Sequence, residues 1–562
     1  MTDWKLAAIT NSALWAAYGD ALGFITELTD VNGLKRRAHL EHVETTVEWR
    51  RLIGGKFGTL VNLPAGSYSD DTQLRLATCR ATRGDGEFDV EAFAKVELPV
   101  WTSYALGAGR GTKTAASELS RRDVAWFSNF YDSPKGRYID GGGNGAAMRI
   151  QPHIWAAQNT TRPESYLRDV IRNSICTHGH PRGFFGAAIY AVCLAETINH
   201  REIPRPDSWE DIIDRLEVVT DVIRDDPDLG AFWLPTWEEL SNTKLEVALK
   251  RIRDEWVSDI RTVRAYINAE PVLAYEKLVN AVGGLSDQRR GCGTTSTLIS
   301  LALSWMYRDV SPRVALETSA NLLSSDTDTI ATMAGALLGI LSDEAPPDII
   351  QDRAYLVSEA ERLFDVSNQK LTKSFQYPDL LHWQPPRSQL DAVGLVDGKL
   401  ALAGIGLCEP VGPEFDGADK SKAVWQWLKL PFGQTALCKR RKIAKPLSAE
   451  NYPAVSTYQL PRASVTRPQQ RMTKPQSLES DLFTNSNRIA ASVMNSNITE
   501  QRTLDDMTTE AIKSGFDVAT LGRHLIECTN HVNGIEMAIA YSSIIAKARI
   551  ARNQADQKKK VG

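Results

Sequence analysis

Two short acidic stretches, Gly66-Ser-Tyr-Ser-Asp-Asp-Thr72 and Ser324-Ser-Asp-Thr-Asp-Thr329, organise this chain. Each places two carboxylates beside hydroxyl groups within a few residues. Such side chains are the hard oxygen ligands that Mg²⁺, Mn²⁺ or Ca²⁺ take, and that zinc or copper does not choose first. Because neighbouring carboxylates repel one another, a folded chain keeps them together only with a cation or strong hydrogen bonds. We therefore expect the two stretches to meet in space and to hold one or two divalent metal ions.

Each stretch taken alone also fits the N-terminus of a helix, where Asp, Ser and Thr cap free backbone amides. A helical pattern follows each of them, over residues 72–106 and residues 329–341. If helices begin there, a rigid element fixes the geometry of the carboxylates. The metal hypothesis depends on the two stretches occurring as a pair.

The segments around these stretches predict a mainly helical fold through about residue 375. Apolar residues recur at helical spacing over residues 4–28, which include Gly19-Asp-Ala-Leu-Gly23. The small residues there allow another backbone or a ligand to approach closely. Glu27 lies just beyond the apolar run and is by itself an ordinary surface carboxylate. Further helices are predicted over residues 184–196, 237–256, 299–306 and 312–322.

Two glycine-rich segments and a histidine pair are further candidates for chemistry. Asp140-Gly-Gly-Gly-Asn-Gly-Ala-Ala-Met-Arg-Ile150 predicts glycines that open a helix, whose exposed N–H groups suit an anion or phosphate. A structural linker is the commoner explanation for such glycines, and neither a Rossmann nor a Walker pattern is present. A second glycine-rich segment, residues 289–298, likewise precedes an apolar helix, the one predicted over residues 299–306. In Thr177-His-Gly-His-Pro-Arg182, His178 is interpreted as a substrate contact or a support for one, and His180 as a packing or capping residue.

Composition restricts the class of protein. The chain has 562 residues, of which 43% are hydrophobic and 24% charged, and its net charge is −4. This length predicts more than one domain, and the balanced charge argues against a general nucleic-acid-binding protein. No secretory signal and no membrane-spanning apolar run is visible. The seven scattered cysteines fit reduced thiols, so we expect a soluble cytoplasmic protein.

The character of the sequence changes after residue 378. We expect a helical domain over residues 1–378, a small β-rich module over 379–444, a flexible linker over 445–500 and a helical segment over 501–562. The module contains an Asp-Gly hairpin signal at residues 395–402 and strand-like pieces at 425–430 and 435–439. Residues 504–552 predict a helical hairpin broken near residues 530–534. An isolated hairpin buries little surface, so it is expected to dock on the main body or on a protein partner.

Five motifs of the chain resemble those of the ADP-ribosylglycohydrolases and occur in the same order as in that family. The family includes the dinitrogenase reductase-activating glycohydrolase and the crystallin J1-like proteins. The motifs are Gly19-Asp-Ala-Leu-Gly23 with Glu27, Ser69-Asp-Asp-Thr72, Gly143-Asn-Gly-Ala-Ala-Met148, Thr177-His-Gly-His-Pro-Arg182 and Asp326-Thr-Asp-Thr329. The resemblance covers about the first 345 residues. It implies an all-α domain with two Mg²⁺ or Mn²⁺ ions in a cleft.

The resemblance also implies roles for individual residues. The metal ligands would be Ser69, where the family usually has Thr, and Asp70, Asp71, Asp326, Asp328 and Thr329. Glu27 matches the family's active-site glutamate, and His178 matches a residue of the cleft. Gly143, Asn144 and Gly145 match the loop near the diphosphate and the distal ribose. The aromatic ring that many members carry near the adenine has no counterpart in Gly291-Cys-Gly-Thr-Thr295.

The function that follows from the resemblance is hydrolysis at C1″ of an ADP-ribosylated protein or small conjugate, releasing ADP-ribose. Glu27 or Asp71 would act as the acid and base on a path through an oxocarbenium-like state. A nucleic acid is expected only as a modified substrate. The competing hypothesis is a protein that binds ADP-ribose without hydrolysing it, or a structural protein of the crystallin J1 type.

Overall fold

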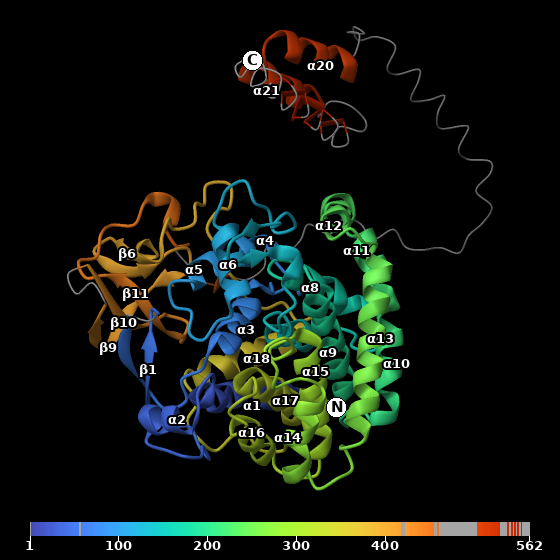
Figure 1. The fold of residues 1–562 in the computed structure, drawn as a ribbon. Coiled ribbons are helices and arrows are strands. Elements are labelled where there is room, and N and C mark those ends of the chain that lie inside the picture. The colour runs from blue at the N-terminus through green and yellow to red at the C-terminus, as the bar shows by residue number, and fades with distance from the viewer. Residues whose placement is uncertain are drawn as a thin grey trace. The chain divides into compact units, whose positions relative to one another are not determined.

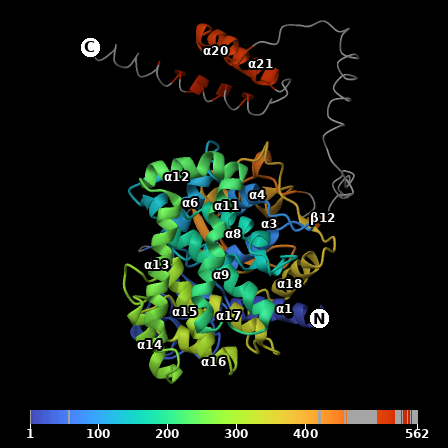
Figure 2. The same ribbon diagram turned by 90° about the vertical axis from the view of Figure 1, so that its right-hand side faces the viewer.

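The computed structural model describes residues 2–55, 58–417, 422–454, 458–459 and 503–528, and a few helical residues between 537 and 552. Residues 1–465 form one compact unit and residues 466–562 form a second. The first unit contains the helices and the small sheets, which are drawn in blue to orange in Figures 1 and 2. The second unit contains the C-terminal helices.

The first unit is built mainly from helices, which confirms the predicted fold class. The helices are α1 (Thr2–Thr26), α2 (Val31–Ala38), α3 (Asp70–Ala81), α4 (Val90–Ala92), α5 (Leu98–Trp101), α6 (Arg110–Leu119), α7 (Gln151–Trp155), α8 (Glu164–Ile175), α9 (Pro181–His200), α10 (Trp209–Asp214), α11 (Val218–Asp225), α12 (Leu234–Ser241), α13 (Leu245–Arg264), α14 (Pro271–Ala281), α15 (Gly293–Met306), α16 (Pro312–Ala320), α17 (Thr327–Leu341) and α18 (Arg353–Ser367). Four of them, α1, α9, α15 and α17, are buried along most of their length and contribute to one continuous apolar core.

The central feature of the core is the close packing of α1 against α17, which lie side by side in Figure 1. A Cβ atom at Gly19 would lie 2.4 Å from the carbonyl oxygen of Ala331, and one at Gly23 would lie 2.4 Å from that of Thr327. These glycines therefore let the two backbones touch. The helix runs through them without interruption and carries its C-terminal end to the start of α17.

Two predicted helices are broken in the structure. The helix predicted over residues 72–106 ends at Ala81, because Thr82 is extended and Gly86 has a positive φ of 94°. A new helical stretch then begins at Val90, capped by Asp89. The helix predicted over residues 237–256 is divided at Asn242, whose left-handed backbone (φ 50°) ends α12. In both places a turn residue outweighs the apolar periodicity.

The strands form small antiparallel sheets. In the predicted β-rich segment, β6 (Val393–Val396), β7 (Lys399–Leu402) and β8 (Gly406–Leu407) form one sheet, and β9 (Glu409–Asp416), β10 (Ala423–Lys429) and β11 (Thr435–Arg441) form another in the order β11-β10-β9. Asp397 and Gly398 both have positive φ in the hairpin turn, as the sequence predicts. Two-residue pairings join β3 (Asp132–Ser133) to β4 (Gly136–Arg137), and β5 (Ser374–Phe375) to β12 (Tyr458–Gln459).

The hairpin of β1 (Trp49–Ile53) and β2 (Thr59–Leu63) was not predicted, and neither was β9. The mainly helical pattern predicted through residue 375 gave no indication of this hairpin. β9 is largely exposed and contains two prolines, so it lacks the alternating apolar pattern of a half-buried strand.

The β-rich segment packs directly on the helices through buried polar contacts. Arg80 of α3 is fully buried, forms an ion pair with Glu97 at 2.7 Å and donates to the side chain of Gln434 at 2.5 Å. The amide of Thr435 donates to Asp352 at 2.7 Å. The domain boundaries predicted at residues 378, 444 and 500 remain predictions, and most of the predicted linker lies outside the described residues.

Among the described residues of the second unit are α20 (Leu504–Lys513) and α21 (Val518–Cys528), which confirm a C-terminal helical segment. The chain turns between them at residues 514–517, where Phe516 has a φ of 65°, and this turn was not predicted. The break predicted near residues 530–534 lies outside the described residues. Among the helices that the structure describes, none combines the length and the apolar character needed to cross a membrane.

Candidate functional site

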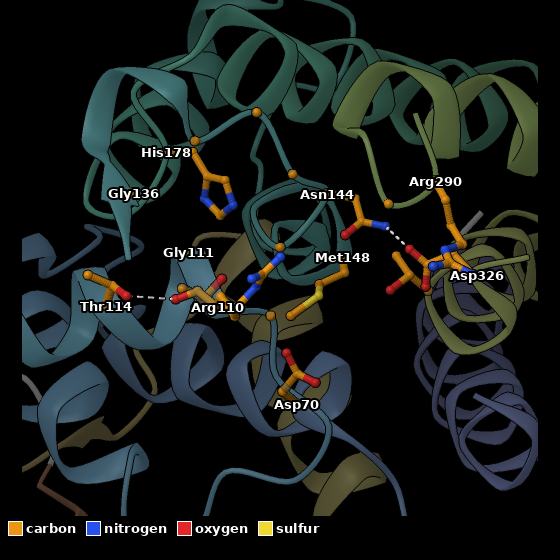
Figure 3. A pocket seen from close by; sticks show the side chains of 18 of the residues that line it. Asp70, Arg110, Gly111, Thr114, Gly136, Asn144, Met148, His178, Arg290 and Asp326 are labelled. Carbon is orange, nitrogen blue, oxygen red and sulfur yellow. Dashed lines mark hydrogen bonds between the residues drawn. The ribbon is translucent and has the colours of Figure 1, made fainter. Parts of the chain in front are cut away.

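The two acidic stretches line one cleft with a volume of about 530 Å³ (Figure 3). The site residues singled out from the sequence that reach it are Glu27, Asp70, Asp71, Gly143, Asn144, Gly145, His178, Asp326, Asp328 and Thr329. Ser69 is fully buried and does not line the cleft. The structure thus brings together segments that are more than 250 residues apart.

The first acidic stretch is fixed by α1. Ser69 caps α3 by accepting a hydrogen bond from the amide of Asp71 at 3.2 Å. Asp20, buried within α1, accepts hydrogen bonds from the amides of Ser69 and Thr72, each at 2.8 Å. Asp70 accepts a hydrogen bond from the amide of Ala108 at 2.7 Å. Asp20 was not singled out, although a carboxylate between two glycines in an apolar helix is an unusual signal.

The second acidic stretch begins α17 and contacts the first. Thr329 donates a hydrogen bond to Asp71 at 3.4 Å, which links the two stretches directly. Asn144 donates from its side-chain amide to Asp326 at 2.7 Å (Figure 3) and to the hydroxyl of Ser296 at 2.9 Å. Asn144 therefore orients a carboxylate, in addition to lying on the loop for which a substrate contact was predicted.

Burial makes this set of carboxylates unfavourable as free anions. Burial, followed by the charge of Glu27 and Asp20, raises the pKa of Asp70 to about 8. Burial and the neighbouring carboxylates also raise the pKa values of Asp71 and Asp328 well above the usual range. Asp71 Oδ1 is buried and has no hydrogen-bond partner among the described residues. The set is therefore stable only when protons or a cation neutralise it.

The two acidic stretches fit a hard divalent cation by the chemistry of their side-chain donors, all of which are carboxylate or hydroxyl oxygens. The unpartnered oxygen of Asp71 is the observation that favours a ligand at this point. Within the described part of the chain, however, no three His, Cys, Asp or Glu side chains form a ready metal-binding group. Hydroxyl groups, water or substrate oxygens would have to complete the coordination of any ion held here.

The two glycine-rich segments pair with each other at the edge of the cleft. Gly143 and Cys292 form an antiparallel bridge, with the amide of Asn144 donating to the carbonyl of Gly291 at 2.9 Å and the amide of Gly293 donating to that of Gly142 at 3.0 Å. The prediction that these glycines open an α-helix is wrong. They lead instead into a short 3₁₀ turn at Ala147–Arg149. Their conformation is set by pairing with the second segment.

His178 and His180 have different environments. His178 faces the cleft, and its Nδ1 lies 2.7 Å from the hydroxyl of Thr177 in a hydrogen bond. Burial and the nearby charge of Arg149 lower the pKa of His178 to about 3, so the ring is neutral at pH 7. His180 caps α9 by accepting a hydrogen bond from the amide of Arg182 at 3.1 Å. The capping interpretation of His180 is confirmed.

Glu27 is held in the cleft by an arginine that the sequence did not indicate. It follows the last residue of α1, and its carboxylate forms an ion pair with Arg51 of β1 at 2.7 Å. The two side chains are only 15% and 13% exposed, respectively. The guanidinium of Arg51 in turn lies 4.3 Å from the centre of the Phe24 ring. Arg51 was missed because the hairpin that carries it was not predicted.

Cations and one aromatic ring also line the cleft without having been singled out. They are Arg110, Lys135, Arg137, Arg290 and Tyr131. Arg110 is the first residue of α6, whose N-cap residue Gly109 offers no side chain to the free amides. Arg110 and Lys135 make this part of the cleft positive. Arg137 is paired with Asp140 at 2.8 Å, and Arg290 lies beside Asp326 (Figure 3). A single arginine or tyrosine in a loop gives no sequence signal of its own.

Comparison with known proteins gives one family. Residues 7–374 match the family model described as ADP-ribosylglycohydrolase. The chain is 25% identical over 354 residues to the Escherichia coli protein YegU, covering 60% of this chain and 88% of that protein. It is 26% identical over 220 residues to the ADP-ribosylhydrolase ARH1 of Dictyostelium discoideum, covering 38% of this chain and 52% of that protein. A solved structure titled ADP-ribosylglycohydrolase-related protein complex aligns with a TM-score of 0.39 at 17% identity, over 65% of this chain and 99% of that one.

Proposed function

Because this chain belongs to the ADP-ribosylglycohydrolase family, we propose that it is a metal-dependent hydrolase that cleaves the C1″ glycosidic bond of an ADP-ribosylated protein or other ADP-ribosyl conjugate. The observation that supports the proposal most strongly is the meeting of both acidic stretches with Glu27 in one cleft. A site that only bound ADP-ribose would not need a further carboxylate beside the buried ones. Glu27 therefore favours hydrolysis over a purely structural or binding role.

In this proposal, two Mg²⁺ or Mn²⁺ ions held by Ser69, Asp70, Asp71, Asp326, Asp328 and Thr329 would neutralise the carboxylates and supply Lewis acidity. The residues of the chain bind and orient the substrate around that centre. The loop of Gly143, Asn144 and Gly145 lines the cleft, where it would lie against the diphosphate and distal ribose. Neutral His178 offers a hydrogen bond without adding charge.

Proton transfer is assigned to a carboxylate of the cleft. Departure of the leaving group from C1″ develops positive charge on the ribose, and nearby carboxylates stabilise that charge. Glu27 or Asp71 would take the proton of the attacking water and return a proton to the leaving atom. The ion pair with Arg51 holds the Glu27 carboxylate in one orientation for this step. Glu27 is thus proposed as a catalytic residue and Arg51 as a positioning residue.

The test is an incubation of the protein with defined conjugates of ADP-ribose to arginine, to serine, to a nucleic-acid base and to a small molecule. Released ADP-ribose is measured by chromatography, with Mg²⁺, with Mn²⁺ and with a chelator. The proposal predicts release that depends on the ion and is lost in Asp328→Ala, with circular dichroism confirming that the variant is folded. Full turnover by Asp328→Ala in chelator would contradict the metal role, and no release from any conjugate would contradict hydrolysis.

A further inference from the structure

A second groove of about 890 Å³ adjoins the cleft and shares three lining residues with it: Arg110, Thr114 and Lys135. Figure 3 shows Arg110 and Thr114 close together on α6. From them the groove continues along α6 past Lys113, Ser117 and Glu118. Its far side is formed by residues 386–389 and Ala392.

The charge of the groove is strongly positive, unlike that of the whole chain. Its lining contains four cations, Arg110, Lys113, Lys135 and Arg387, and one carboxylate, Glu118. Glu118 is already paired with Arg121 at 3.2 Å. Within the part of the chain that the structure describes, none of the four cations forms an ion pair. A chain whose net charge is −4 thus has a concentrated patch of cations next to its candidate active site.

The far side of the groove comes from residues outside the family match, which ends at residue 374. These residues are anchored on the helical body. Gln389 donates to the carbonyl oxygen of Thr102 at 2.9 Å, and Trp383 donates to that of Lys95 at 2.7 Å. Asp391 is paired with Arg441 of β11 at 2.6 Å. The β-rich part of the chain therefore holds Arg387 in place opposite α6.

The composition of the lining selects among anionic occupants. Beside the cations it offers hydroxyl groups and one amide, from Thr102, Thr114, Ser117, Ser120, Ser133, Ser388 and Gln389. None of the residues lining this groove is aromatic. Single-stranded nucleic acid is usually bound by stacking its bases on aromatic rings, which this groove does not provide. An acidic peptide needs only the cations and hydrogen-bonding groups.

We propose that this groove binds an acidic segment of an ADP-ribosylated protein, next to the modified residue whose ADP-ribose occupies the cleft. The inference rests on the proposed function and names its substrate class: a protein with Asp or Glu flanking the modification site. Arg110 and Lys135 join the two sites, so the peptide and its ADP-ribose occupy one continuous surface. The β-rich extension thereby supplies specificity for the target.

The test compares two synthetic peptides that carry ADP-ribose on the same residue, one flanked by three Glu and the other by three Gln. The variant is Arg387→Glu, which reverses a charge of the groove at a position that does not line the cleft. Lys277→Glu, an exposed position on α14, is the control with the same change in charge. Release of ADP-ribose gives kcat and KM, and fluorescence anisotropy of the labelled peptides gives binding.

We expect kcat/KM to be about tenfold higher for the Glu peptide than for the Gln peptide at low salt, because charge complementarity favours its encounter and binding. Arg387→Glu should remove most of this preference, about fivefold to tenfold, through KM, and leave the Gln peptide unchanged. Lys277→Glu should have no effect. Raising the salt concentration should reduce the preference, since exposed charges are screened.

Equal kcat/KM and equal binding for the two peptides would overturn the groove assignment while leaving the hydrolase proposal intact. Binding of the Glu peptide that depends on Arg387, without release of ADP-ribose from either peptide, would support the groove and contradict the proposed hydrolysis. A labelled oligothymidylate is the competing ligand. If it bound more tightly than the Glu peptide and lost that binding in Arg387→Glu, the occupant would be a nucleic acid and the peptide proposal would be wrong.

Discussion

Replacing Gly23 with alanine tests whether the close approach of α1 and α17 builds the acidic cleft. A Cβ atom at Gly23 would lie 2.4 Å from the carbonyl oxygen of Thr327 and 2.5 Å from the Cα atom of Asp328. Both contacts are with backbone, so no side chain can rotate away. Ordinary contact begins at 3.4 Å, so the two helices must separate by about 1 Å at this point.

The expected effect on stability is small, and the expected effect on activity is large. Alanine favours a helix over glycine by about 1 kcal/mol, while overpacking a tight core costs about 1–3 kcal/mol, so the net loss is at most about 2 kcal/mol. The shift falls on the backbone of Asp328 itself. A displacement of about 1 Å in a reactive site lowers activity roughly a hundredfold. We therefore predict that kcat/KM for release of ADP-ribose falls about a hundredfold in a folded protein.

A matched control separates the cleft from the helix packing. Gly339→Ala places a Cβ atom 2.6 Å from the carbonyl oxygen of Asn11 in the same helix pair. Gly339 lies 11 residues beyond Asp328, which corresponds to about 16 Å along α17. Urea unfolding should show similar stability changes for the two variants, with most of the activity kept in Gly339→Ala. Unchanged activity in a stable Gly23→Ala protein, or equal losses in both variants, would refute the reasoning.

Three further predictions concern residues outside the acidic stretches. Arg80→Met leaves Glu97 buried without its partner, so urea unfolding should show a loss of about 3–5 kcal/mol, whereas a loss below 1 kcal/mol would contradict the importance of this pair. Burial lowers the pKa of His153 to about 3. Because the unfolded chain takes up that proton near pH 6.5, stability should fall by up to about 1.4 kcal/mol per pH unit as the pH drops from 6.5 toward 3. In His153→Phe this part of the acid sensitivity should disappear from the pH dependence of unfolding. Arg51→Met should lower kcat roughly tenfold by releasing the Glu27 carboxylate, with little change in KM, and an unchanged kcat would show that the ion pair does not position it.

The chemistry of the site could be predicted from the sequence where several ligand-type residues are close together. The two acidic stretches, each with adjacent carboxylates and hydroxyls, stand out in this way, and the structure brings them to one cleft. Helical periodicity likewise located α1, α9, α16 and α17 within a few residues of their true ends, whereas α15 begins six residues before the predicted start at residue 299. The Asp-Gly turn located the hairpin of β6 and β7, because two successive positive φ angles demand such residues.

The features of the site that the sequence did not predict depend on tertiary contacts, which leave no local pattern in the sequence. Arg51 reaches Glu27 only because an unpredicted hairpin folds beside the end of α1. Asp20 has a role only once the loop before α3 lies against α1, where two amides point at its carboxylate. The pairing of Gly143 with Cys292 joins loops almost 150 residues apart. In each case the two partners are far apart in the sequence, and only the packing of the elements that carry them brings them into contact.

The central claim is that the two acidic stretches together hold divalent cations, and titration of the protein with Mn²⁺ by calorimetry tests it most directly. The measurement uses the whole chain and the variants Asp71→Asn and Asp328→Asn, each checked for folding by circular dichroism. We predict saturable binding to the wild-type protein and a loss of at least about a hundredfold in affinity in each variant, because both stretches contribute ligands. Wild-type affinity in both variants would contradict the claim.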